Sequence, residues 1–244
     1  MATTTRDNSV SEAPAKLQRA VRPCRESTPH PFCFNVDQYS RMFELGWFGD
    51  KRVELLNGEV FSKYDARSWR WNVKHYEKMA ALGWFSGRKV QLVGGKVYEM
   101  SPMNNPHWWG IARTMECLRQ VFGKGYLVVS QLPLTLGEHA QPEPDVAVLA
   151  VDVKNHPVEK PTSALLVVEI SDTTLRFDQT KKSLDYAQAG IIEYWILNLK
   201  ARQLEVRRNP NAKGYSETTT LKADDKVSPL SSPDAKIKVA DLLP

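Results

Sequence analysis

The chain has 244 residues, 42% of them hydrophobic and 25% charged, with a net charge of +5. These values are typical of an ordinary globular protein with one good core, and the charge is compatible with nucleic acid without identifying a partner. The longest apolar runs, 164–168 and 191–197, are far shorter than the roughly 20 residues of a membrane helix. Residues 1–20 lack the apolar segment of a secretory signal, so we expect a cytoplasmic protein without a membrane span.

The first 30 residues are rich in Thr, Ser, Ala, Arg and Pro and contain almost no large apolar residues. Burial cannot offset the entropy lost on ordering such a segment, so residues 1–30 are predicted to form a disordered basic arm. A solvated tail is favoured over phosphate contact for this arm. No zinc site is expected, because no C-x-x-C pair occurs among the three cysteines, Cys24, Cys33 and Cys117.

An internal duplication follows the arm. Residues 34–63 align without gaps on residues 71–100, and the shared frame includes Asn-Val, Tyr, Met and Leu-Gly-Trp-Phe. In each copy we predict a helix that starts at the Asn-Val pair and ends at the Gly of Leu-Gly-Trp-Phe, where glycine can cap it. A hairpin should follow, because Asn57-Gly58 and Gly94-Gly95 are two-residue turn pairs between apolar strands.

The rest of the chain alternates helix and strand patterns. Residues 107–122 place Ile111, Met115, Leu118 and Phe122 on one helix face. A second helix is predicted from Asp178 to Ala189, where Gly190 stops it. Strands are predicted at 126–130, 132–136, 145–149, 165–170, 193–199 and 203–207, with weaker signals at 215–221 and 237–239. This order predicts an α/β or α+β domain with a mixed sheet.

Two predicted strands present a carboxylate among apolar residues, Asp145 and Glu169. Burying an unpaired carboxylate is costly, and a divalent cation is the natural compensation because hard cations take oxygen ligands. Asp178, Lys182 and Tyr186 recur every four residues and therefore share one stripe of the following helix. Lys182 can thus point back at the strand ends.

These features resemble a known family. The segments EPDVAVL, VVEIS, D-x-x-x-K-x-x-x-Y-x-x-x-G and IIEYWILNL, with the V-x-L-x-x-G hairpin, MSP and His107, are similar to the bacterial Uma-two family of restriction-endonuclease-like proteins. The resemblance runs from about residue 71 to the end of the chain. It implies a PD-(D/E)xK nuclease core, with a central mixed sheet flanked by helices, over residues 69–244. Residues 31–68 would then be the duplicated helix-hairpin unit.

The resemblance also implies roles for individual residues. Asp145 would be the acid of the PD motif, Glu169 the second acid, and Lys182 the catalytic lysine, because Ser171 occupies the usual lysine position. Together with the backbone carbonyl of Ile170, the two acids would bind Mg²⁺, with Mn²⁺ as an alternative. The expected function is Mg²⁺-dependent endonuclease cleavage of DNA. A homodimer is also compatible with this family.

One position departs from the family pattern. The glutamate usual in the V-E-L-x-x-G hairpin is Gln91 here, and the glutamate occurs instead as Glu54 in the first copy. The enzyme could work with two acids, Glu54 could reach the site, or activity could be lost. The alternative function is therefore a catalytically impaired nucleic-acid-binding or interaction protein. His107 and Asp178 are further auxiliary candidates.

Simpler interpretations exist for each of these residues. The two acids could cap strands or form ion pairs, and Asp178 with Lys182 could be a surface ion pair at i, i+4 spacing. For His107 a structural hydrogen bond is favoured over acid-base chemistry. Trp108 and Trp109 are interpreted as core residues before any other role.

Overall fold

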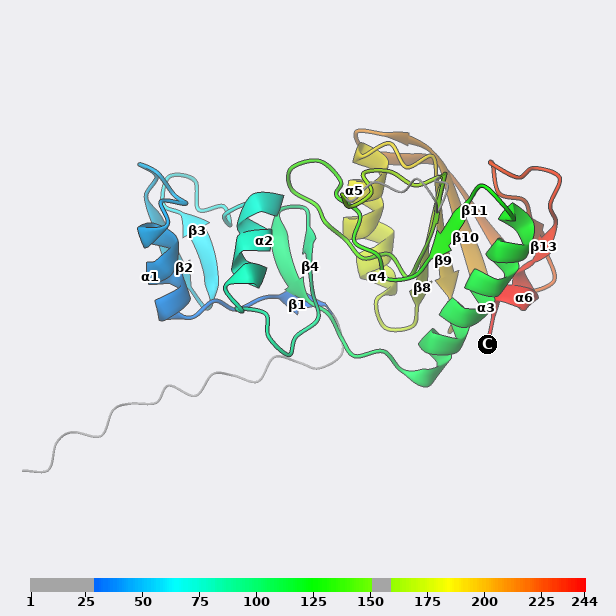
Figure 1. Ribbon diagram of the computed structural model, residues 1–244, viewed down its shortest axis with the longest axis horizontal. Helices are drawn as coiled ribbons and strands as arrows, with labels where there is room; N and C mark the ends of the chain where they lie inside the picture. The colour runs from blue at the N-terminus through cyan, green and yellow to red at the C-terminus, as the bar shows by residue number, and fades with distance from the viewer. Residues whose placement is uncertain (1–28, 151–158) are drawn as a thin grey trace, which may run out of the picture.

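The computed structural model describes residues 29–150 and 159–244 (Figure 1). All but the last two residues of the predicted N-terminal arm lie outside this range. The described chain forms two parts, a pair of helix-hairpin copies followed by a sheet with helices on both faces. In the described residues, no helix combines the length and the apolar character needed to cross a membrane.

The larger part is built on a six-stranded sheet with the order β11-β10-β9-β8-β7-β6. Neighbouring strands are antiparallel except β8 and β9, which are parallel. The predicted mixed sheet is therefore confirmed. Its strands are β6 (Leu127–Val129), β7 (Val146–Leu149), β8 (Leu166–Ser171), β9 (Glu193–Asn198), β10 (Gln203–Asn211) and β11 (Gly214–Lys222).

Helices cover both faces of this sheet. One face packs on α3 (Asn105–Phe122) and α6 (Val239–Leu242), around a core that includes Ile111 and Trp195. The other face is covered by the consecutive helices α4 (Leu175–Phe177), η2 (Asp178–Lys182) and α5 (Ser183–Gln188). Side chains alternate between the two cores along β7 (Val146–Leu149) and the two strands that follow it, as a period of two requires. A short pair, β12 (Lys226–Val227) and β13 (Ile237–Lys238), lies near the C-terminus.

Two sequence predictions are wrong in detail. Residues 132–136 form no strand, since Leu134 and Leu136 donate main-chain hydrogen bonds to Pro142 and Ala140 in a loop that closes over the sheet. Both leucines are buried there, so their alternation reflects packing and not a strand. The predicted helix 178–189 begins earlier, at Leu175, and its middle section η2 is a π-helix.

The two copies of the duplicated segment contain the same elements in the same order. The first forms α1 (Val36–Glu44), β2 (Val53–Leu56) and β3 (Glu59–Ser62), and the second forms α2 (Val73–Ala81), β4 (Val90–Val93) and β5 (Lys96–Glu99). Residues Asn57 and Gly58, like Gly94 and Gly95, have positive φ at the hairpin turns, as the two-residue turn requires.

The segment that precedes each copy pairs with the hairpin of the other copy. Pro31, in β1 (His30–Pro31), lies opposite Tyr98 of β5. Ser68, ahead of the second copy, lies opposite Phe61 of β3. Pro31 and Ser68 occupy equivalent positions of the duplication, and so do Phe61 and Tyr98. Each hairpin therefore pairs with the segment that precedes the other copy.

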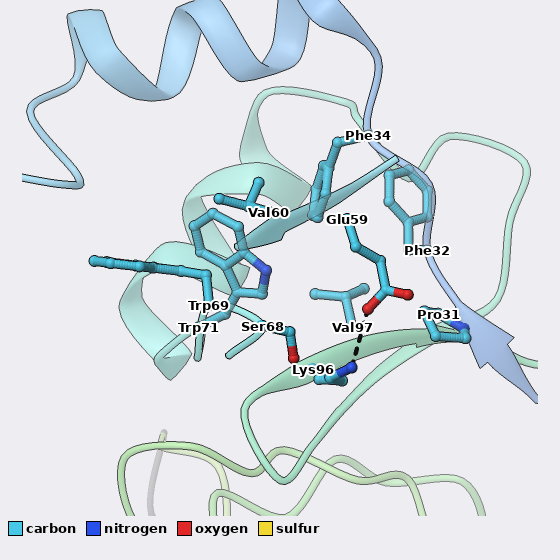
Figure 2. Close-up of a pocket in the computed structure, with 10 residues that line it drawn as sticks. All are labelled: Pro31, Phe32, Phe34, Glu59, Val60, Ser68, Trp69, Trp71, Lys96 and Val97. Atoms are coloured by element: carbon cyan, nitrogen blue, oxygen red, sulfur yellow. Dashed lines mark hydrogen bonds and ion pairs between the residues drawn. The ribbon is translucent and has the colours of Figure 1, made fainter. Parts of the chain in front are cut away.

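The copies share one aromatic-rich core, and equivalent side chains meet where they touch. The ring centroids of two such pairs lie 5.4 Å and 5.7 Å apart. The ammonium and carboxylate of the third pair, joined by the dashed line in Figure 2, lie 2.9 Å apart. These pairs are Phe34 with Trp71, Trp47 with Trp84, and Glu59 with Lys96. Contact between equivalent positions is characteristic of a twofold axis, so the copies form an internal pseudo-dimer.

Candidate active site

The register of β7 and β8 brings Asp145 and Glu169 together. Val146 pairs with Val168 in this antiparallel ladder, so the next position places Asp145 opposite Glu169. Both side chains share the sheet face of Ala147 and Val167, the face covered by η2 and α5. Both residues are buried.

Asp145 is held by one main-chain and one side-chain contact. Its Oδ2 accepts the Ile170 N–H at 2.8 Å and lies 2.9 Å from Nε2 of His107, although the His107 contact lacks hydrogen-bond geometry. Burial works to raise the pKa of Asp145, but His107, Lys182 and the Ile170 amide outweigh it and hold the pKa below its usual value. Asp145 is therefore ionised at neutral pH.

Glu169 and Lys182 form a buried ion pair. Lys182 Nζ donates to Glu169 Oε1 at 2.9 Å, and the Tyr186 hydroxyl donates to the same oxygen at 2.6 Å. The predicted stripe of Lys182 and Tyr186 therefore does face the strand ends. The simpler interpretation of a surface ion pair is wrong, since Asp178 and Lys182 are 2% and 3% exposed.

Three carboxylates share this single ammonium. Burial raises the pKa of Glu169 to about 8, with Asp145 and Asp178 adding to the rise against the opposing effect of Lys182. The pKa of Lys182 is also raised, because the attraction of Glu169, Asp178 and Asp145 outweighs its burial. The ammonium therefore stays charged at neutral pH, and Glu169 takes up a proton more readily than an exposed glutamate.

Asp178 belongs to this cluster through the π-helix. Its Oδ2 accepts from Ser171 Oγ at 2.7 Å and from Thr174 Oγ1 at 2.6 Å, while Oδ1 lies 3.8 Å from Lys182 Nζ. Burial raises its pKa against the opposing effects of Lys182 and the two hydroxyls. Single π-helical turns occur frequently at functional sites.

Helix α3 reaches the cluster at its N-terminal end. Asn104 caps the helix by accepting the His107 amide, and His107 follows within the first turn. Helix α3 lies so close to β8 that a Cβ on Gly110 would be only 2.8 Å from Ile170 Cγ2. The glycine thus lets α3 pack against β8.

Gln91 and Glu54, the equivalent positions of the two copies, lie in different environments. Gln91 is buried at the site, where Nε2 lies 3.4 Å from the Glu143 carbonyl and Oε1 has no partner among the described residues. Glu54 is half-exposed in the first copy, with its carboxylate 3.9 Å from Lys63. It does not line the cluster's pocket, so Glu54 does not reach the site.

One pocket joins these groups. It is lined by side chains of the second copy, α3, the ends of β7 and β8, and η2, including Gln91, His107, Asp145, Glu169, Asp178 and Lys182. Gln131 also lines it, and the sequence offered no motif that singles out this residue. Trp108 and Trp109 are each 54% exposed, so their interpretation as core residues is wrong.

The pocket fits a cation that keeps some of its water. Asp145 Oδ1 and Glu169 Oε2 have no hydrogen-bond partner in the described residues. Within 29–150 and 159–244, no three His, Cys, Asp or Glu side chains form a ready metal-binding group. Two carboxylates suit Mg²⁺, which commonly takes one or two carboxylates and completes its shell with water and phosphate.

Comparison with known proteins identifies the family. The model of the family Uma2, described as "Putative restriction endonuclease", matches residues 73–240. The chain belongs to the Uma2 family. The resemblance recognised in the sequence is confirmed, and the match includes every residue of the buried cluster while leaving the first helix-hairpin copy outside it.

A solved structure supports the same fold. It is described as "a putative nuclease belonging to DUF820" from Anabaena variabilis, and it matches this Uma2 chain with a TM-score of 0.53 at 16% identity. The alignment covers 64% of this chain and 90% of the other. No curated protein matches the chain. The likeness establishes a nuclease-type fold.

Proposed function

We propose that this Uma2 protein is a Mg²⁺-dependent endonuclease that hydrolyses phosphodiester bonds of DNA. The observation that carries the proposal is the pairing of Asp145 with Glu169 across β7 and β8, with the buried Lys182 against Glu169. When ionised, the three carboxylates around Lys182 exceed its single charge, and a divalent cation would balance that excess and favour the ionised form of Glu169. Mn²⁺ is an alternative cation.

In this proposal each residue has a distinct task. Asp145, Glu169 and the Ile170 carbonyl would hold the cation, which would supply the charge that lowers the pKa of the attacking water and stabilises the charge developing on the phosphate. Lys182 stays protonated, because its pKa is raised. It therefore donates to the attacking water or to a phosphate oxygen and does not act as a base. His107 positions Asp145.

The proposal is tested by cleavage of supercoiled and linear DNA, and of RNA, with and without Mg²⁺ or Mn²⁺. We expect metal-dependent cleavage of DNA by the unmodified protein and a loss of at least roughly a hundredfold in Asp145→Asn and Lys182→Met, since each removes a group that acts on the transition state. Circular dichroism melting of each variant separates lost chemistry from lost folding. Glu54→Gln is the matched control, because Glu54 lies away from the pocket.

Two results would overturn the assignment. Full activity of Asp145→Asn would remove the proposed centre from the reaction. Binding of DNA by the unmodified protein, without cleavage under either metal, would favour the alternative of a non-catalytic relative in which Gln91 replaces the usual acid.

A further inference from the structure

The pocket contains a strained residue that the mechanism above does not use. Gln131 follows β6 and has φ of +53°, in the left-handed region that non-glycine residues rarely adopt. Such a conformation is unfavourable for a residue other than glycine and persists where the surroundings enforce it, often at functional sites. The other positive-φ residues of the described chain that are not glycine do not line this pocket.

The fold fixes Gln131 beside the two acids. The β6–β7 ladder ends with Val129 opposite Ala147, and the register of β7 and β8 places Asp145 opposite Glu169. Just beyond β6, the Gln131 amide donates to the carbonyl of Pro144, the residue before Asp145, at 3.0 Å. Gln131 therefore lies beside Asp145, in the pocket that Asp145 and Glu169 line.

The side chain of Gln131 presents an unused hydrogen-bond donor. Its Nε2 is buried and has no partner among the described residues. A buried amide without a partner is costly, and native proteins rarely tolerate one unless a ligand or water completes it. Because N–H groups cannot bind a cation, the missing partner is an acceptor such as an anionic oxygen.

A second side chain of the same pocket complements this donor. Gln91 also lines this pocket, and its Oε1 accepts no hydrogen bond from the described residues. Gln131 therefore lacks an acceptor, and Gln91 lacks a donor. A phosphodiester with an attacking water supplies both. The carboxylates would repel a phosphate unless donors faced it, and the donors that line the pocket include Lys89, Lys182 and Gln131.

We propose that Gln131 is a substrate-binding residue whose side-chain amide donates a hydrogen bond to a phosphate oxygen of the bound nucleic acid. This inference rests on the proposed nuclease function. The left-handed backbone at Gln131 turns the chain after β6 and keeps the side-chain amide in the pocket of Asp145 and Glu169. The residue holds the substrate and takes no part in proton transfer.

The test compares Gln131→Leu, Gln131→Glu and Gln131→Asn with the unmodified protein. Binding of a fluorescent oligonucleotide is measured by anisotropy with Ca²⁺ in place of Mg²⁺, and cleavage is measured separately with Mg²⁺. Gln131→Leu should weaken binding and raise KM about tenfold with a smaller change in kcat, as expected for the loss of one hydrogen bond to a charged group. Gln131→Glu should bind more weakly still, because its carboxylate repels phosphate.

Melting temperature separates binding from a structural role. Gln131→Leu removes an unpaired donor and should melt at no lower temperature than the unmodified protein, while Gln131→Asn tolerates the left-handed backbone and should keep part of the affinity. Gln120→Leu, an exposed glutamine on α3, is the matched control.

The possible outcomes separate this inference from the function on which it rests. Unchanged affinity and KM in Gln131→Leu and Gln131→Glu, in a protein that binds and cleaves DNA, would overturn the role of Gln131 alone. A fall in melting temperature that accounts for the lost affinity would do the same. If the unmodified protein neither binds nor cleaves nucleic acid, both proposals fail.

Discussion

At the scale of single residues, the centre is defined by an imbalance of charge. Asp145, Glu169 and Asp178 are all buried, and Lys182 is the one lysine that contacts any of them within the described chain. His107 adds a contact to Asp145 that is charged only when the ring is protonated. An excess of buried negative charge is unstable without a cation, so metal binding and stability should be coupled.

Gln91 offers a direct way to increase that coupling. Gln91→Glu would add a buried carboxylate to the pocket, which should lower stability without metal by roughly 2–4 kcal/mol and enlarge the gain in melting temperature on adding Mg²⁺. Scanning calorimetry with and without millimolar Mg²⁺ measures both effects. Gln91→Leu, similar in size but uncharged, should show no enlarged metal effect. A metal-induced shift equal in Gln91→Glu and the unmodified protein would contradict this prediction.

At the scale of elements, α3 depends on one glycine. Alanine normally stabilises a helix interior by about 1 kcal/mol relative to glycine. At Gly110 we expect the opposite sign, because the new Cβ would lie 2.8 Å from Ile170 Cγ2 and would push α3 away from β8.

Gly110→Ala should therefore lose about 1–3 kcal/mol in urea unfolding. It should also lower activity, since His107 is on the same helix. The exposed Gln120→Ala tests helix propensity without packing and should leave both properties nearly unchanged. A Gly110→Ala variant that is more stable than the unmodified protein would show that the helix can relax at no cost.

The elements also show what the sequence could predict. The hairpin turns at Asn57-Gly58 and Gly94-Gly95 were predictable because a two-residue turn demands positive φ, which these residues adopt readily. Residues 132–136 were mistaken for a strand because alternating leucines satisfy the same period when a loop packs over a sheet. Local periodicity cannot distinguish these two environments.

The candidate site was predictable where motif and period agreed. Asp145, Glu169 and Lys182 were found because the carboxylates stand out in apolar strands and the lysine lies on the helix stripe that faces them. Gln131 was missed because its place depends on how the chain after β6 packs beside the segment before β7, which no local pattern encodes. The exposure of Trp108 and Trp109 was missed for a similar reason, since it depends on how the start of α3 packs.

At the scale of the whole molecule, Asp185 joins the pseudo-dimer to the larger sheet. Its Oδ2 accepts the Gly94 N–H, at the turn of the second hairpin, at 2.7 Å. Burial raises the pKa of Asp185 to about 6, against the opposing effects of the Gly94 amide and nearby basic groups. The folded protein therefore holds this proton more tightly than the unfolded chain, whose Asp pKa is about 3.9.

The raised pKa sets the sign of a pH effect. The stability contribution of protonated Asp185 is fully present below about pH 4 and is lost as pH rises through about 6. The Asp185→Asn variant lacks this pH dependence. The free energy of unfolding of the variant minus that of the unmodified protein should therefore rise by on the order of 3 kcal/mol between pH 4 and pH 7. Urea unfolding across that range measures the difference, with the exposed Asp234→Asn as control. A difference that stays constant with pH would rule out this origin.

The pair Glu59–Lys96 at the contact between the copies has a further consequence. In an association of two identical chains, a residue on the symmetry axis meets its own duplicate, so a glutamate there would face a glutamate and a lysine would face a lysine. Here the two equivalent positions carry opposite charges and attract one another at 2.9 Å. Covalent linkage of the copies lets each half specialise: Glu54 of the first copy lies away from the pocket, and Gln91 of the second copy lines it. A repeat fused in one chain can thus acquire an asymmetry that no homodimer of identical subunits can encode.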